Sequence, residues 1–216
     1  MSSEIVLPVA AGVRVRLAVP AGAKPEPPGD LPAVDVASLP GASVPLRAGF
    51  RGDGVTVRVA CATAPSTGWA PGVEEIVLAR AGQIARGALG GEVERFEPGD
   101  VVAAGARFEQ RFEAAVRQGE ERLAARGRHV LGFVGPARDG VLCTVACTEP
   151  LPGGGCKALV EATEVEGAWV EAPPPSLLVR GILKVAEAPW EAGGALGLAA
   201  LAVVALVIAR RPRPRV

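Results

Sequence analysis

Apolar and polar side chains alternate strictly near the start of the chain, at residues 13–19 (VRVRLAV). A strand turns successive side chains to opposite faces, so a period of two is typical of a half-buried strand. The pattern predicts that the valines and the leucine lie in the core. It places Arg14 and Arg16 in solvent, because a slip of one residue would bury both charges.

Turn residues precede two further alternating segments. Residues 51–54 (RGDG) contain an Asp-Gly pair, which favours a tight hairpin, and residues 55–61 (VTVRVAC) alternate directly after it. The first three of these turn residues also spell an integrin-binding tripeptide, but a turn is the simpler interpretation. Residues 138–140 (RDG) repeat the turn signal before residues 141–147 (VLCTVAC). We therefore expect a strand after each turn.

Two other segments are less clear-cut. Residues 108–116 (FEQRFEAAV) fit a helix and a strand about equally. We favour a strand with Gln110 pointing inward, because the neighbouring segments are strands. Residues 156–165 (CKALVEATEV) are also interpreted as a strand, following a Gly- and Pro-rich loop.

One soluble segment has a clear helical period. Within residues 74–89, apolar side chains recur at the spacing of one helix face, at Val77, Ala81, Ile84 and Ala88. Two glutamates begin the segment, where the helix dipole favours negative charge, and two glycines end it. A second amphipathic helix is predicted after the prolines at 173–175.

The C-terminal segment predicts a transmembrane helix. Residues 192–209 form a run of 18 residues without a charge, near the lower limit for spanning a bilayer. Trp190 precedes the run, as aromatic residues at membrane interfaces do, and Arg210 and Arg211 end it. We therefore expect lipid contact through this helix, with residues 189–216 forming the anchor and its basic tail.

Two orientations remain open. Clustered arginines at the C-terminus favour a cytoplasmic tail and an exported domain. Export requires a signal peptide, and residues 1–13 lack its basic start and clean apolar run. A tail-anchored protein with a cytoplasmic domain at the cell membrane is the preferred interpretation.

Charge argues against nucleic acid as a partner. The chain has 23 basic and 23 acidic residues, and four arginines lie among its last seven residues, so the remainder carries about −4. Such a domain lacks the basic stripe of a nucleic-acid-binding protein. Tyrosine is absent and other aromatic residues are scarce, so platforms for base stacking are not expected either.

The four cysteines are the strongest candidates for chemistry. Cys143 and Cys147 lie on one strand face about 13 Å apart, too far to bond to each other. A hairpin with residues 148–155 as its loop would bring Cys147 close to Cys156. We expect a disulfide between these two, with Cys61 and Cys143 as a possible second pair.

Two alternatives to disulfides are considered. The four thiols could be separate and buried, packing as small apolar residues. A zinc site is disfavoured, because a C-x₃-C spacing on a strand spreads its ligands apart and no C-x₂-C pair is present.

Catalytic and cofactor motifs are missing from the sequence. His129 is the single histidine, so any Ser-His-Asp or Cys-His arrangement must use it. It begins an apolar segment and has no G-x-S-x-G motif near it, so we interpret it as structural. The glycine-rich segments match neither a phosphate loop nor a dinucleotide fingerprint, and no cofactor is expected.

The region 105–147 resembles the PsbP-type α/β/α sandwich of the photosystem II extrinsic protein and its relatives. The shared rhythm is "G-x-H-hydrophobic", here residues 127–131 (GRHVL), followed by "D-G-x-L-hydrophobic", here residues 139–143 (DGVLC). The resemblance implies a binding or assembly module without catalytic residues.

Together these patterns predict an α/β (or α+β) fold. An antiparallel sheet with packed helices would occupy residues 1–188, and one transmembrane helix would follow. The predicted function is a membrane-tethered, non-enzymatic binding or assembly module with an unidentified protein partner. The alternative is a hydrolase or other enzyme whose active site the sequence does not reveal.

Overall fold

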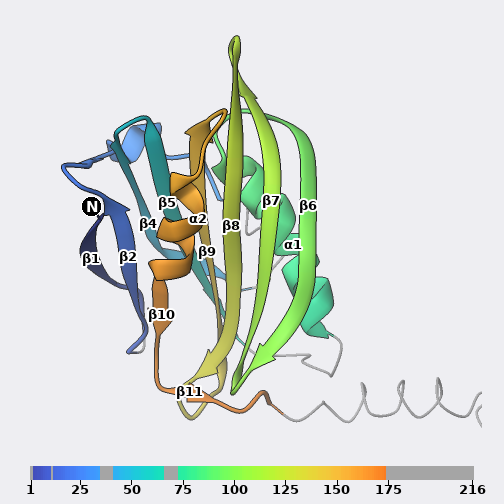
Figure 1. Cartoon of the computed structure of the whole chain (residues 1–216). Coiled ribbons are helices and arrows are strands. Elements are labelled where there is room, and N and C mark those ends of the chain that lie inside the picture. Colours follow the sequence, from blue (N-terminus) through green and yellow to red (C-terminus); the bar gives the residue numbers. More distant parts are fainter. Residues whose placement is uncertain (1, 11, 35–40, 66–72, 174–216) are drawn as a thin grey trace, which may run out of the picture. The chain divides into compact units, whose positions relative to one another are not determined.

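The alternating segments form strands that assemble into two antiparallel sheets (Figure 1). The computed structural model describes residues 2–10, 12–34, 41–65 and 73–173. Within these ranges the chain is mainly β-structure, with two α-helices and one short 3₁₀ helix, η1 (Pro28–Asp30).

The larger sheet has eight strands, in the order β3-β4-β5-β9-β8-β7-β6, and β11 pairs with β8 beyond the start of β7. Every neighbouring pair in it is antiparallel. Its strands are β3 (Lys24–Pro25), β4 (Ser43–Gly52), β5 (Val55–Ala64), β6 (Glu92–Ala104), β7 (Arg107–Gln118), β8 (Glu121–Val134), β9 (Asp139–Pro150) and β11 (Trp169–Val170).

The smaller sheet contains β1 (Ser2–Pro8), β2 (Arg14–Pro20) and β10 (Glu164–Glu166), with β2 in the middle. Val15 and Leu17 of β2 are 0% exposed, whereas Arg14 and Arg16 point outward and pair with Glu166. The predicted alternation of this strand is therefore confirmed. Its apolar face contacts α2 and β4 and belongs to the largest core cluster, which also includes side chains of β5 and β9.

Two hairpins of the larger sheet form at or beside the predicted Asp-Gly turns. Asp53 and Gly54 join β4 to β5, with φ angles of 52° and 74°. These positive values are typical of a two-residue turn. In the second hairpin, the turn spans residues 135–138, so Asp139 and Gly140 already belong to β9. The ambiguous segment around Phe108 is a strand, and Gln110 is buried as predicted.

The two helices cover opposite faces of the larger sheet (Figure 1). Helix α1 (Val73–Ala88) confirms the predicted helix and packs against β6 to β9. Its buried residues include Leu78, Ala81 and Ala85, a face displaced from the predicted one. Helix α2 (Gly155–Ala162) packs on β9, β8 and β2 on the other side.

The strand predicted at residues 156–165 is wrong. The segment forms α2, and only Glu164–Glu166 is strand. Cys156, Leu159 and Val160 are its buried residues, a spacing of three and four that fits a helix. There is consequently no hairpin between Cys147 and Cys156; a strand is followed by a helix instead.

The predicted fold class is also wrong. The described chain is dominated by antiparallel sheet, rather than being an α/β or α+β arrangement followed by a transmembrane helix. Neither described α-helix combines the length and apolar character needed to cross a bilayer. This corrects the prediction of a single-pass, tail-anchored protein with a lipid-contacting helix. Residues 189–216, with Trp190, Arg210 and Arg211, lie outside the described residues, as does the helix predicted after residue 175.

A pair of substitutions in β2 tests the register of the small sheet. Val15→Asp places a carboxylate at a fully buried position and should lower the free energy of unfolding by about 3 kcal/mol or more. Arg16→Ser removes partly exposed ion pairs and should change it by less than about 1 kcal/mol. Urea unfolding of both variants measures the difference; equal losses would contradict the register.

Candidate functional site

The four cysteines form two disulfides, which makes them the candidate site with the clearest chemistry. Cys61 on β5 lies directly opposite Cys143 on β9 in the strand register, and their Cα atoms are 4.1 Å apart. This bond links neighbouring strands whose cysteines are 82 residues apart in sequence. It closes a loop that contains α1 and three entire strands, β6 to β8.

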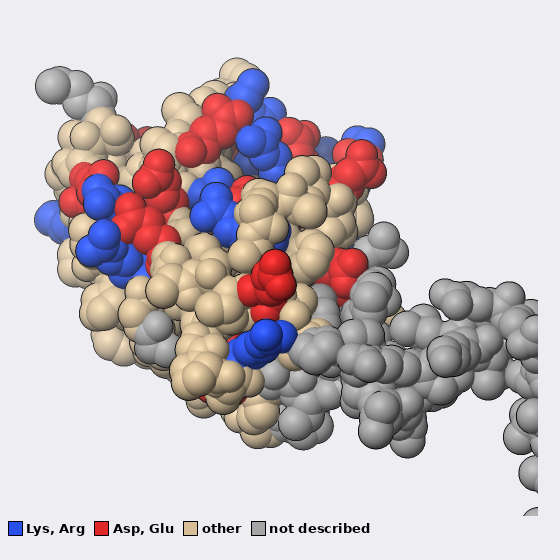
Figure 2. Space-filling view, turned by 90° about the horizontal axis from the view of Figure 1, so that it is seen from below, with Lys and Arg blue, Asp and Glu red and all other residues tan. Residues whose placement is uncertain are grey.

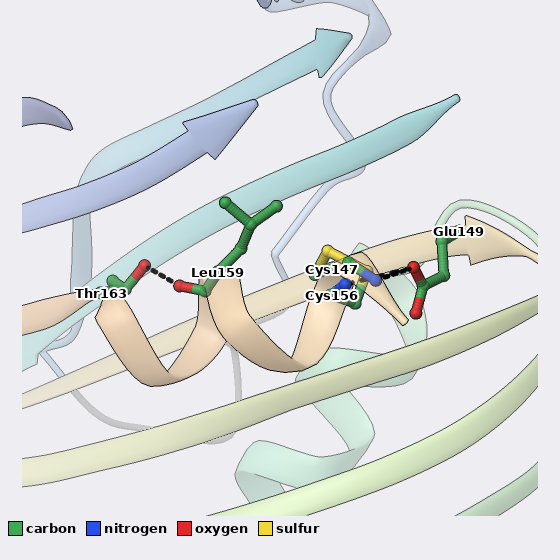
Figure 3. The surroundings of a disulfide bond; sticks show 6 residues. Cys147, Glu149, Cys156, Leu159 and Thr163 are labelled. Carbon is green, nitrogen blue, oxygen red and sulfur yellow. Dashed lines mark hydrogen bonds between the residues drawn. A yellow bond between two sulfur atoms is a disulfide. The ribbon is translucent and has the colours of Figure 1, made fainter. Parts of the chain in front are cut away.

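The second disulfide joins β9 to α2. Cys147 points from the sheet toward the first turn of the helix, where Cys156 meets it (Figure 3). Their Cα atoms are 5.4 Å apart, within the range that a disulfide requires. The helix brings the cysteines together in place of the hairpin expected from the sequence.

Both ends of α2 are capped by side chains. Glu149 is 4% exposed, and its Oε2 accepts hydrogen bonds from the backbone N–H groups of Gly155 (2.7 Å) and Cys156 (3.1 Å) (Figure 3). Thr163 donates from Oγ1 to the carbonyl of Leu159 at 2.8 Å. A carboxylate at a helix N-terminus neutralises the unpaired N–H groups and favours the helix.

These surroundings favour a structural role for the second disulfide over a redox role. Cys147 and Cys156 are both 0% exposed, so an external thiolate cannot reach their sulfur atoms in the folded domain. Reactive cysteines at helix N-termini lie in electropositive, accessible surroundings. Here the Glu149 carboxylate occupies the N-terminus instead.

A row of buried side chains lies on the other face of the larger sheet, the face that α1 covers. His129 on β8 stacks on Phe112 of β7, with ring centroids 4.9 Å apart, and its Nδ1 lies 2.9 Å from Oγ1 of Thr144 on β9. Phe112 stacks in turn on Phe96 of β6, over which Arg86 of α1 lies at 4.9 Å. The row therefore runs from the surface of α1 to the middle of the sheet.

Gly127 permits this row. It lies directly opposite Phe112 in the strand register, and a Cβ atom there would lie 2.2 Å from the Phe112 ring and 2.3 Å from the Val145 carbonyl oxygen. Neither a backbone carbonyl nor a ring held between two neighbours can retreat by the required ångström. Phe112 can therefore pack flat on β8 because residue 127 has no side chain.

The environment of His129 argues against a catalytic role. The residue is 0% exposed, and burial lowers the pKa of its imidazole to about 3. A general base works best with a pKa near the operating pH and must reach its substrate. Thr144, its hydroxyl neighbour, is 3% exposed and equally inaccessible.

A buried ion cluster ties the segment after β3 to the larger sheet. Arg58 of β5 donates two hydrogen bonds to the Glu26 carboxylate, at 2.7 and 3.0 Å, and a third to the carbonyl of Leu89 at 3.1 Å. The Glu26 side chain is 4% exposed. Burial alone would raise the pKa of Glu26, but the hydrogen bonds and charges of Arg58 and Arg51 hold it below its usual value.

The low pKa of Glu26 matters for function. A carboxyl group that acts as a general acid needs a raised pKa, so this cluster is suited to holding the fold. The Glu166 carboxyl also has a lowered pKa, because Arg14 and then Arg16 stabilise its charge. In both glutamates, nearby arginines are the cause of the lowered pKa.

Ion pairs cover the outer face of β6, β7 and β8. Arginines and glutamates face each other along and across the strands, as in Arg126–Glu113, Arg107–Glu109 and Arg117–Glu94. Seen from below, acidic and basic side chains are interspersed rather than gathered by sign (Figure 2). This distribution gives no large field of one sign to attract a polyanion.

The concavities of the described surface are either open or small. An open hollow of about 470 Å³ lies at the turn between β1 and β2, lined by residues 8–10 and 12–14. A small one, of about 20 Å³, lies between residues 31–34 and the floor formed by Ala60, Thr144 and Ala146, and has room for about one water molecule. Another, of about 190 Å³, is shallow and lies beside the exposed Leu151. Among the described residues there is also no cluster of three or more histidines, cysteines or carboxylates that could hold a metal ion.

Sequence reasoning missed three groups that hold the fold. The Glu26–Arg58 pair joins residues 32 positions apart that carry no local motif. Glu149 was visible only as part of a loop, although a carboxylate shortly before a helix is a capping signal. The contact between His129 and Thr144 follows from the pairing of β8 with β9, which places the two residues opposite each other.

Comparison with known proteins gives little further information. No family model and no curated protein matches the chain. One similar solved structure is LpqN of Mycobacterium tuberculosis, described as involved in cell envelope biogenesis. The two chains are 11% identical with a TM-score of 0.44, and the match covers 76% of this chain and 91% of LpqN. A likeness at this level carries no argument about function, and the PsbP-type resemblance stays a prediction.

The two disulfides should contribute unequally to stability. In the chain-entropy model, the bond between Cys147 and Cys156, nine residues apart, contributes about 3 kcal/mol, and the bond that spans 82 residues contributes about 4.5 kcal/mol. Replacing both cysteines of one pair by alanine should therefore destabilise more for Cys61 and Cys143. Urea unfolding of both double variants tests this order; the reverse order would contradict the entropic account.

His129 should make the protein less stable in mild acid. The unfolded chain binds a proton on this residue near pH 6.5, whereas the folded chain does so only near pH 3. The unfolded state therefore holds more protons in this window. Stability should fall as the pH drops, by up to about 1.4 kcal/mol per pH unit.

Unfolding measured between pH 7 and pH 5.5 isolates this effect, because Glu26 keeps most of its charge in both states there: its pKa is 4.5 in the unfolded chain and lower in the folded one. His129→Leu should remove most of the slope even if it lowers the overall stability. An unchanged slope in that variant would show that His129 is not the group responsible.

Proposed function

We propose that this chain is a non-enzymatic binding or assembly domain that works in an oxidising compartment. The observation that carries the proposal is the pairing of all four cysteines in two buried disulfides. Disulfides persist in exported proteins and are rare in the reducing cytosol, where free thiols would be expected instead. The pairing favours an exported domain over the cytoplasmic one preferred from the sequence.

The position of the disulfides supports a scaffold rather than a redox enzyme. All four cysteines belong to the largest core cluster, and each of them is 0% exposed. One disulfide links the neighbouring strands β5 and β9, and the other links the eight-residue helix α2 to β9. A helix of this length is marginal by itself, so the covalent link and the Glu149 cap favour its docked state.

Binding is favoured over catalysis by the state of the titratable groups. The single histidine is buried with a pKa near 3, and the Glu26 and Glu166 carboxyls have lowered pKa values caused by arginine partners. None of these groups is poised for proton transfer near neutral pH. The paired charges on β6 to β8 offer a broad polar surface of the kind that forms the rim of protein interfaces.

Thiol trapping tests the compartment. The full chain is expressed with and without a secretion signal, then denatured in the presence of a maleimide, and the intact mass is measured. We expect no label after export and labelling of the cysteines after cytosolic expression, with a lower melting temperature for the reduced form. Free thiols in the exported, folded protein would contradict the proposal.

An activity assay tests the other half of the proposal. The oxidised protein is assayed with ester and peptide substrates beside the His129→Leu variant. We expect no turnover above background from either. Hydrolysis by the unaltered chain that His129→Leu abolishes would establish the enzyme alternative.

A further inference from the structure

The outer edge of β1 is unpaired among the described residues. In the smaller sheet β1 pairs with β2 alone, so half of its backbone N–H and C=O groups point away from the sheet. Such an edge can accept another strand, and proteins normally protect it with charges, prolines or bulges.

The other long edge of the domain, β6, shows this protection. Its register with β7 is interrupted between Val93 and Arg95 and again between Pro98 and Val101. Proline within the strand removes a donor, and a bulge twists the edge away from a partner. Acidic side chains add charge along the strand, at Glu92, Glu94, Glu97 and Asp100.

Strand β1 lacks these devices between its ends. It pairs with β2 in unbroken register from Ser2 to Pro8, and its proline is the last residue. Its one charged side chain, Glu4, lies 3.4 Å from Arg16 of β2. Among the residues that the structure describes, β6 is thus a protected edge and β1 an open one.

Strand β1 carries apolar side chains on both of its faces, in its second half. Ile5 and Leu7 are only partly buried against the largest core cluster, and Val6 on the other face is 52% exposed. A strand added beside β1 would cover the remaining apolar surface of all three residues. An exposed apolar strand at an open edge indicates an interaction site.

We propose that a second copy of this chain pairs with β1 in antiparallel orientation, with Val6 facing the partner's Val6. In this register Ile5 faces the partner's Leu7 and Glu4 faces the partner's Pro8. The smaller sheets of the two copies then join into one six-stranded sheet around a two-fold axis. Ile5, Val6 and Leu7 each meet an apolar residue of the other copy.

Charge selects this register. Centred on Val6, the two Glu4 side chains lie about 13 Å apart along the strands. A register centred on Glu4 would place the two carboxylates directly opposite each other, which is destabilising. Glu4 keeps its ion pair with Arg16 in the proposed arrangement, because both residues lie on the outer face of the same copy.

The dimer should be weak. Two seven-residue strands meeting edge to edge bury less than the roughly 1,200–2,000 Å² of a standard stable interface. Association should therefore depend on concentration, with monomers at low micromolar levels. Weak self-association of this kind suits a domain that assembles when it is locally concentrated.

Sedimentation equilibrium of the full chain, from about 1 μM to about 1 mM, tests the proposal. We expect a monomer–dimer equilibrium that Val6→Lys weakens at least tenfold, because two lysines would then lie opposite each other. Val102→Lys is the matched control, since Val102 is 58% exposed but lies on β6. Val6 lies opposite Arg16 of β2, so Val6→Lys should lower the melting temperature slightly, whereas Val102→Lys, opposite Glu109, should leave it unchanged; both variants should still unfold cooperatively.

Cross-linking gives an independent readout of the register. Val6→Cys should form a disulfide-linked dimer under mild oxidation, whereas Val102→Cys should not. A monomer at the highest concentration overturns the proposal. So does self-association that Val6→Lys and Val102→Lys affect equally, or a Val6→Cys variant that fails to cross-link.

Discussion

Strand β9 carries two of the four cysteines, and through them it is covalently joined to β5 within the sheet and to α2 above it. It is also the most buried strand, since nine of its twelve residues, from Val141 to Glu149, are buried. A strand covered on both faces must fill two cores at once. The residues facing α2 and β2 belong to one cluster and those facing α1 to two others. Strands β5 and β8 and both helices contact β9 directly, so its position determines theirs.

The two faces of the larger sheet differ in how many buried polar side chains they carry. Toward α2 the core is mainly valines, leucines and disulfides, and its buried polar groups, Glu149 and Thr163, form hydrogen bonds at the two ends of α2. Toward α1 it contains Gln110, His129 and Thr144, which also need hydrogen bonds. Gln110 donates to the Gly99 carbonyl at the bulge of β6, and His129 pairs with Thr144. Buried polar groups need partners, and the irregular edge of β6 supplies one of them.

Much of the sheet could be predicted from the sequence, because alternation and Asp-Gly turns are local signals. The strands around Val15, Val57 and Val145 were recognisable in this way. Helix α2 was not: its three buried residues fit a helical period, but eight residues are too few for that period to stand out beside the neighbouring strands. The pairing of Cys61 with Cys143 was proposed as a possibility, but the register that places them opposite each other joins strands distant in sequence. The Glu26–Arg58 cluster has no sequence signal, because it depends on where the loop after β3 meets β5.

The cross-links also determine how the domain would respond to a mechanical force applied through its ends. Tension passes along the shortest covalent path, so it bypasses the residues between Cys61 and Cys143 and those between Cys147 and Cys156. At about 3.4 Å per residue, roughly 300 Å of chain is withheld from extension. Strands β6, β7 and β8 and helix α1 lie entirely inside this shielded length, as do the two ends of β9. Stretching the oxidised domain would detach β1 to β4 and the segment after α2, while the central strands remain tied to each other.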